Sequence, residues 1–217
     1  MKYFTLIFCI ILLLASCEKN NVKEYTADFQ DQFRTYIEVN YQQESNSTRV
    51  LVLFSHPIYF YSSLKLPSNS YIKVNGIDLI EYEYGYSNDF VGKPICNIEF
   101  KDTDGTVYKN VLVPPDTAYF IDFPDTVFSV GDFTFQVNTP NLDSNERTGI
   151  CQSCDLYERD FKPLIDSLYS LEDLDIHQQT NNYLLLYLYK THLKPKLPAG
   201  GGSIIYNYIV PKTFYVE

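Results

Sequence analysis

The chain has 217 residues, a formal net charge of −10 and an apolar fraction of 45%. This composition provides enough apolar side chains for the buried core of one large domain or two smaller ones. Its excess of acidic residues repels phosphate backbones, which argues against nucleic acid as a partner. The basic run Lys190, His192, Lys194 and Lys196 is too short to reverse that charge, and such runs are typical of solvated segment ends.

The first residues of the chain have the pattern of a secretory signal. Lys2 precedes an apolar run over residues 3–14, and this run is shorter than the roughly 20 residues that span a bilayer. The sequence Leu14-Ala15-Ser16-Cys17 closes the run, and polar residues follow at once. These four residues resemble the lipobox of bacterial lipoproteins, in which the cysteine is acylated and becomes the first residue of the mature chain.

The lipobox resemblance implies a location in the cell envelope. It predicts a signal peptide over residues 1–16, a lipid anchor on Cys17 and a polar tether over 17–27 that lifts the fold off the membrane. Glu18 after the cysteine is similar to Gram-negative sorting patterns that favour the outer membrane. The alternative interpretations are a plain secretory signal with an incidental cysteine and an N-terminal membrane helix.

An envelope location also determines which cysteines remain. Cys9 would leave with the signal and Cys17 would carry lipid, so Cys96, Cys151 and Cys154 would remain in an oxidising compartment. The Cys151 and Cys154 pair lacks the histidine of a haem site, a second cysteine pair for zinc and the strand that precedes a thioredoxin-like motif. We therefore expect one structural disulfide, with Cys151 and Cys154 as the favoured pair, and no cofactor.

Most of the mature chain predicts strands. Residues 28–37 keep a helical spacing of apolar side chains but run into 36–41, which prefers a strand, so both assignments stay open there. Residues 49–54 are rich in β-branched and apolar side chains and predict the next strand. Further strands are expected over 119–123, 133–138, 183–190, 203–210 and 213–216, with Gly200-Gly201-Gly202 as a flexible turn.

Two hairpins are predicted between these strands. Asn75-Gly76 tolerates positive φ and suits a tight turn from residues 71–74 into 77–86. The second hairpin joins residues 95–100 to 106–113, and Pro114-Pro115 ends it by removing backbone donors.

One helix is expected near residues 161–172. Asp160 is a candidate N-cap, and Pro163 falls in the first turn, where proline is tolerated. The apolar residues that would share one face of this helix are Phe161, Leu164, Ile165, Leu168 and Leu171.

Many short strands with turn signals between them predict an all-β fold of one or two antiparallel β-sandwiches. The stretch 69–138 resembles the immunoglobulin-like domains of bacterial lipoproteins in its hairpin, its Leu112-Val113-Pro114-Pro115 strand end and its Ile121-Asp122-Phe123-Pro124 segment. It lacks the tryptophan and paired cysteines of antibody domains, and the resemblance assigns no functional residues. We expect an immunoglobulin-like sandwich over 28–125 and a second, helix-containing β domain over 126–217.

Motifs for catalysis or metal binding are weak. Asp102-x-Asp104-Gly105 begins like a calcium loop, but Val107 and Val113 stand where an EF-hand needs glycine and glutamate, so a hairpin turn is the better interpretation. Ser62-x-x-Lys65 matches the first motif of penicillin-interacting enzymes, whose later motifs are missing. The histidines His56, His177 and His192 lack metal-ligand spacing.

Tyrosine is unusually frequent, with 20 residues against no tryptophan. The ladder Tyr82, Tyr84 and Tyr86 alternates with Glu81 and Glu83, as in a half-buried strand, so we expect at least two of the three rings to lie in the core.

If these rings are exposed instead, they form a binding surface that stacks on sugars.

Taken with the lipobox resemblance and the weak catalytic motifs, the sequence predicts a lipid-anchored envelope protein that is a non-enzymatic binding or structural module, with an envelope protein or a polysaccharide as partner. Glycan binding and an envelope hydrolase are the alternatives.

Overall fold

The computed structural model describes residues 33–55, 65–82, 85–128, 133–139, 142, 144–152, 162–163, 168–170, 181–198 and 200–217. These residues form strands, turns and connecting segments, and no helix among them is long and apolar enough to cross a membrane. The strands make three sheets that pack on a large hydrophobic cluster, and Leu185, Tyr187 and Ile209 of the largest sheet form a second, small cluster. The all-β prediction is therefore confirmed for the part of the chain that the structure describes.

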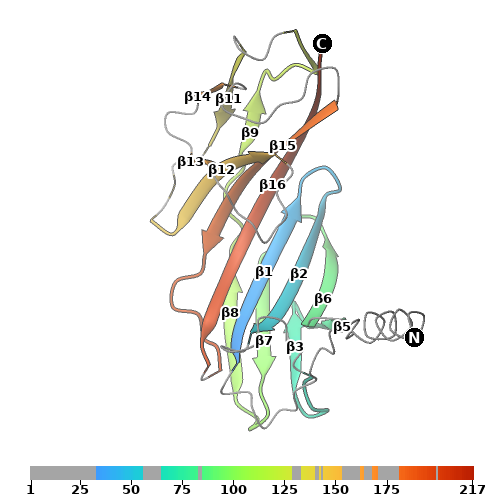
Figure 1. Cartoon of the computed structure of the whole chain (residues 1–217). Coiled ribbons are helices and arrows are strands. Elements are labelled where there is room, and N and C mark those ends of the chain that lie inside the picture. Colours follow the sequence, from blue (N-terminus) through green and yellow to red (C-terminus); the bar gives the residue numbers. More distant parts are fainter. Residues whose placement is uncertain are drawn as a thin grey trace, which may run out of the picture.

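The largest sheet has nine strands in the order β13-β12-β15-β16-β1-β2-β6-β5, with β10 pairing to β16 outside this path. Its strands are β1 (Arg34–Gln42), β2 (Ser47–Ser55), β5 (Ile80–Tyr82), β6 (Gly85–Val91), β10 (Thr126–Val127), β12 (Glu146–Gln152), β13 (Lys162–Pro163), β15 (Asn181–Thr191) and β16 (Gly202–Val216). Figure 1 shows β16 running the length of the molecule from its lower end to the C-terminus at the top.

Two smaller sheets lie against this main sheet. The four-stranded sheet has the order β4-β3-β7-β8 and contains β3 (Tyr71–Val74), β4 (Ile77–Asp78), β7 (Cys96–Lys101) and β8 (Val107–Leu112). The three-stranded sheet has the order β14-β11-β9 and contains β9 (Tyr119–Ile121), β11 (Thr134–Asn138) and β14 (Leu168–Ser170). The first lies beside the lower half of the main sheet and the second beside its upper part (Figure 1).

The core forms where the inward faces of these sheets meet. Along β15, Leu184, Leu186 and Leu188 are each fully buried, as the two-residue period of a strand requires. Phe54 of the main sheet packs against Phe100 of the four-stranded sheet, with ring centroids 6.1 Å apart. Equivalent contacts from Phe123 to its aromatic neighbours join the three-stranded sheet to β16. Aromatic rings thus supply the bulk that a tryptophan-free core needs.

Strand β16 lies at the centre of the main sheet. It pairs in parallel with β1 through a register that runs from Thr35↔Gly202 to Gln42↔Ile209, and antiparallel with β15. The main sheet consequently takes strands from both of the segments, 28–125 and 126–217, that the sequence predicts as domains. The starts of β1 and β16 are joined by a hydrogen bond from the Thr35 N–H to the Gly201 carbonyl, 2.9 Å long.

Both predicted hairpins are present. In the β3–β4 turn, Asn75 and Gly76 have φ values of 53° and 82°, which is the left-handed region that this residue pair tolerates. Strands β7 and β8 pair antiparallel from Cys96↔Leu112 to Lys101↔Val107, and the second hairpin ends before the two prolines as expected.

The helix predicted near residues 161–172 is wrong for the positions that the structure describes. Lys162–Pro163 pairs with β12 as strand β13, and Leu168–Ser170 pairs with β11 as strand β14. Cross-strand hydrogen bonds at the sheet margins therefore outweigh the helical spacing of the apolar side chains. The other residues of that segment lie outside the described part of the chain.

The strand predicted over 77–86 is interrupted. Strand β4 belongs to the four-stranded sheet, whereas β5 and β6 belong to the main sheet. Leu79 lies between β4 and β5 and is buried, so the chain passes from one sheet to the other with an apolar side chain in the core between them. The ambiguous segment that begins at residue 28 is a strand from Arg34 onward.

Candidate functional site

The anchor and disulfide residues fall largely outside the described residues. Cys17 and Cys154 are not among them, and Cys151 is described only as part of the backbone of β12, opposite Leu185. The favoured disulfide stays a prediction. Cys96 is a free, fully buried thiol, and burial raises its pKa to about 11, which makes it a packing group rather than a nucleophile.

The structure places the tyrosine ladder in different environments. Tyr86 is buried, and its hydroxyl accepts a hydrogen bond from the Leu66 N–H at 2.8 Å. Tyr82 is half-buried at the end of β5, and Tyr84 lies outside the described residues. Glu81 is exposed and pairs with Lys65 at 3.6 Å, whereas Glu83 is also undescribed. The described rings therefore do not make a continuous exposed platform.

The Asp102–Asp104 motif acts as the turn of the β7–β8 hairpin. Asp102 accepts a hydrogen bond from the Asp104 N–H at 3.0 Å, and Asp104 accepts one from the Thr106 N–H at 2.7 Å. Burial raises the pKa of Asp102. The side-chain hydrogen bond between Asp104 and Asp102 lowers the pKa of Asp104 to about 2. Across the described residues, no group of three or more histidine, cysteine or acidic side chains is placed to hold a metal ion.

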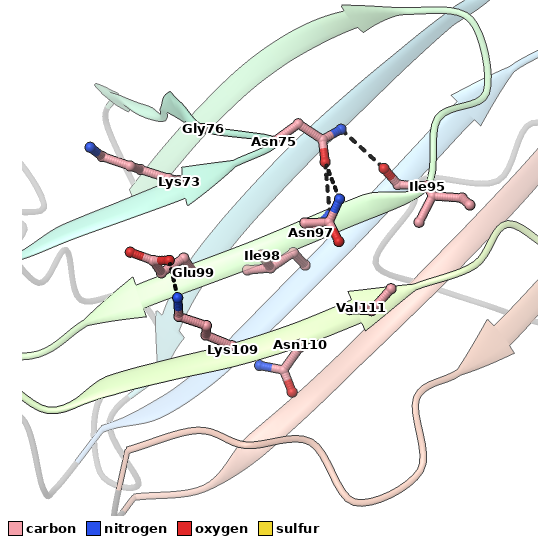
Figure 2. Close-up of a pocket in the computed structure, with 10 residues that line it drawn as sticks. All are labelled: Lys73, Asn75, Gly76, Ile95, Asn97, Ile98, Glu99, Lys109, Asn110 and Val111. Carbon is pink, nitrogen blue, oxygen red and sulfur yellow. Dashed lines mark hydrogen bonds and ion pairs between the residues drawn. The ribbon is translucent and has the colours of Figure 1, made fainter.

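A shallow groove of about 580 Å³ lies on the outer face of the four-stranded sheet. Figure 2 shows its walls, which come from strands β3, β7 and β8 and from the β3–β4 turn. The volume is within the range of ligand sites in proteins, although the lining has more polar and charged groups than a typical small-molecule pocket. Its side chains are those of Lys73, Asn75, Ile95, Asn97, Ile98, Glu99, Lys109, Asn110 and Val111.

One end of the groove is made by a pair of asparagines. Asn75 Oδ1 accepts hydrogen bonds from the Asn97 backbone N–H at 2.9 Å and from Asn97 Nδ2 at 3.0 Å. Asn75 Nδ2 donates to the Ile95 carbonyl at 3.0 Å, and these contacts appear in Figure 2. The left-handed backbone of Asn75 turns its amide back onto β7, so the same residue makes the hairpin turn and fixes the groove wall.

The other end of the groove carries a row of alternating charge. The strand register places Lys73 opposite Glu99 and Glu99 opposite Lys109, so the three charged residues form one row across neighbouring strands. Lys109 Nζ is 3.0 Å from Glu99 Oε2, while Lys73 Nζ is 3.7 Å from Asp78 at the rim. Lys109 is 71% exposed, so much of its ammonium faces solvent.

The electrostatics of this row keep Glu99 ionised. The Tyr71 hydroxyl donates a hydrogen bond to Glu99, and Lys109 donates a second. Together they lower the pKa of Glu99, and the same hydrogen bond raises the pKa of Tyr71. Glu99 can accept hydrogen bonds from a ligand at neutral pH, but it cannot serve there as the proton donor that glycoside hydrolysis requires.

A smaller crevice of about 170 Å³ continues from the groove at Val111. It lies between the end of β8 and the end of β15, where Val113, Lys190 and His192 line it. Lys190 forms an ion pair of 2.9 Å with the buried carboxylate of Glu146. This pair fixes Lys190 in the crevice wall, and His192, Val111 and Val113 are among the other residues that line the crevice.

The amino-acid sequence alone does not reveal this groove. It predicts Asn75 only as a turn residue, and nothing in the order of residues shows that β3, β7 and β8 align Lys73, Glu99 and Lys109 in one row. The available signal was the alternation of polar and apolar residues along 96–101, which places Asn97 and Glu99 on one strand face.

Comparisons with known proteins do not assign this chain to a family. No family model matches it, and no curated protein matches it. Among solved structures it is similar to the fibronectin(III)-like modules of Clostridium thermocellum CbhA, at a TM-score of 0.28 and 9% identity, over 82% of this chain and 89% of that chain. The three packed sheets themselves define an all-β protein of sandwich type.

Proposed function

We propose that this chain is a lipid-anchored protein of the cell envelope, attached to the outer membrane through Cys17, and that it acts as a non-enzymatic binding module. The lipobox resemblance supports the anchor. The groove on the four-stranded sheet supports the binding role, because it presents ionised and amide groups on a rigid sheet whose opposite face is packed into the core.

The observation that carries the binding role is the row Lys73, Glu99 and Lys109. Each of these groups is held by a cross-strand partner, so a ligand would meet charged donors and an acceptor in fixed positions. Such preorganisation reduces the entropy lost on binding. An envelope hydrolase would need a second carboxyl near Glu99 with a raised pKa, and the residues that line the groove contain no other carboxylate.

A more specific form of this proposal is that the ligand of the groove is a polysaccharide. Sugar hydroxyls donate and accept hydrogen bonds, and the asparagine pair and the charged row offer both kinds of partner along one groove. The exposed faces of Ile95 and Val111, 52% and 53% accessible, would contact the apolar C–H face of a ring between these polar groups.

Affinity electrophoresis against a panel of soluble polysaccharides tests this assignment. We expect at least one polysaccharide to retard the parent protein. Lys109→Ala should weaken that retardation about tenfold, the loss typical of a hydrogen bond to a charged group, and Asn97→Ala should weaken it about fivefold, as for a neutral hydrogen bond. Arg49→Ala is the matched control, because Arg49 is an exposed residue on β2 that pairs with Asp89. Equal retardation of all variants would contradict the groove assignment, and no retardation by any member of the panel would contradict the polysaccharide candidate.

A further inference from the structure

The loop between β15 and β16 carries two exposed lysines in a fixed conformation. The Asn110 side chain holds the loop, because its Nδ2 donates to the Lys196 carbonyl and its Oδ1 accepts from the Lys196 N–H, both at 2.8 Å. A turn bond of 2.8 Å from the Gly201 N–H to the Pro198 carbonyl closes the loop. Two residues before Lys196, Lys194 has a φ of 56°, an uncommon conformation for a residue with a side chain.

The charges of this loop are not neutralised by described residues. Lys194 and Lys196 are exposed and make no ion pair within the described part of the chain, in contrast to Lys190 with its Glu146 partner. Leu193 precedes them and is 61% exposed. The loop therefore combines an exposed apolar side chain with two cationic side chains, the pattern of segments that bind at a lipid headgroup surface.

The loop runs down the side of the fold and ends beside the start of the described chain. Thr35 at the start of β1 is hydrogen-bonded to Gly201 at the end of the loop, and Arg34 adds an exposed cation to the same end. Figure 1 shows that β1 and β16 both begin at the lower end of the molecule. The β7–β8 hairpin, with the exposed carboxylate of Asp104, reaches the same end from the other sheet (Figure 1).

We propose that Leu193, Lys194 and Lys196 dock on anionic lipid headgroups of the membrane that holds the protein. The inference rests on the proposed anchor, because a lipid on Cys17 would tether this end of the fold to the bilayer. A chain with a net charge of −10 is repelled by an anionic leaflet, so a locally cationic end sets which face turns toward it. Docking would hold the groove in one orientation relative to the membrane.

The absence of tryptophan from the chain gives a direct probe of this contact. The full-length lipidated protein with Leu193→Trp is reconstituted in phosphatidylcholine vesicles, with and without phosphatidylglycerol. We expect the tryptophan emission to shift to the blue only on the anionic vesicles. We also expect the shift to disappear in about 1 M salt, where the Debye length falls to about 3 Å.

Charge variants in the Leu193→Trp background separate docking from anchoring. The double variant Lys194→Glu/Lys196→Glu should lower the ratio of docked to undocked protein by about 25-fold or more, at about fivefold per lysine near an anionic surface. The control Arg49→Glu/Lys65→Glu changes the net charge equally at two exposed residues of other segments and should keep the shift. A tryptophan placed by Val91→Trp, at a position 89% exposed on β6, should not shift.

Flotation with the neutral vesicles reports the anchor independently of the emission shift. If the protein floats with both kinds of vesicle and the Leu193→Trp emission is the same on each, docking is contradicted while the anchor stands. If the protein fails to float with neutral vesicles, the anchor is contradicted. A blue shift produced in solution by a soluble acidic polysaccharide would assign the loop to that ligand and overturn membrane docking.

Discussion

Gly202→Ala should destabilise the mature protein by roughly 4 kcal/mol or more, the range reached when a substitution forces backbone strain. A Cβ at residue 202 would lie 1.8 Å from the Thr35 carbonyl oxygen and 2.8 Å from the Thr35 nitrogen. The obstacle is backbone of the neighbouring strand rather than a flexible side chain, and the φ of 140° adds strain for any residue with a Cβ. The parallel pairing of β1 with β16 therefore depends on this glycine.

Urea unfolding measures the effect, with Gly76→Ala as the control. Gly76 also has positive φ, at 82°, but nothing lies within 4 Å of the Cβ that alanine would add. Its replacement should cost about 1–2 kcal/mol, the conformational penalty alone. Equal losses of stability in the two variants would contradict the close packing of β1 on β16 as the reason for glycine at position 202.

Tyr86→Ala should cost about 3–5 kcal/mol, the loss expected when a buried aromatic side chain is truncated. The Tyr86 ring is 8% exposed and packs edge-on against Phe54 with centroids 6.2 Å apart. Its hydroxyl also satisfies the Leu66 N–H. Tyr86→Phe should keep the packing and lose about 1–3 kcal/mol, because it leaves that N–H without its acceptor.

Thermal melts of the two Tyr86 variants beside Tyr82→Ala test this assignment. Tyr82 is only half-buried, so its truncation should cost clearly less than that of Tyr86. A Tyr86→Ala protein that melts with the parent would show that the ring is an exposed platform residue, and a search for a stacked sugar ligand would then begin at β6.

Local chemistry explains what the sequence predicted correctly. Asn75-Gly76 defines its own turn through the positive φ of both residues, and the prolines after β8 stop pairing wherever they occur. The short apolar run within 183–190 predicts a buried strand without reference to any partner, and residues 184–188 are all buried. Each of these sequence patterns lies within a few residues of the turn, strand end or strand that it predicts.

The features that were missed depend on partners far away in the chain. Strand β16 pairs with β1 across most of the sequence, and no local pattern indicates that pairing or the need for glycine at position 202. The residues predicted as a helix have helical spacing, but β12 and β11 offer them strand partners. The groove is likewise a product of register, because its charged row exists only once three strands are aligned.

The mass of the protein extracted from the cell envelope tests the proposed anchor, and with it the envelope assignment, most directly. We expect a chain that begins at Cys17 and carries acyl chains on that residue. We also expect Cys17→Ala to abolish the acylation and to release the protein from detergent-extracted membranes. Each buried methylene contributes about 0.8 kcal/mol to the attachment, so several acyl chains would hold the parent firmly while the variant would have no such anchor. A parent chain without acyl mass, or a Cys17→Ala variant with unchanged mass and membrane partition, would show that Cys17 is not a lipid anchor.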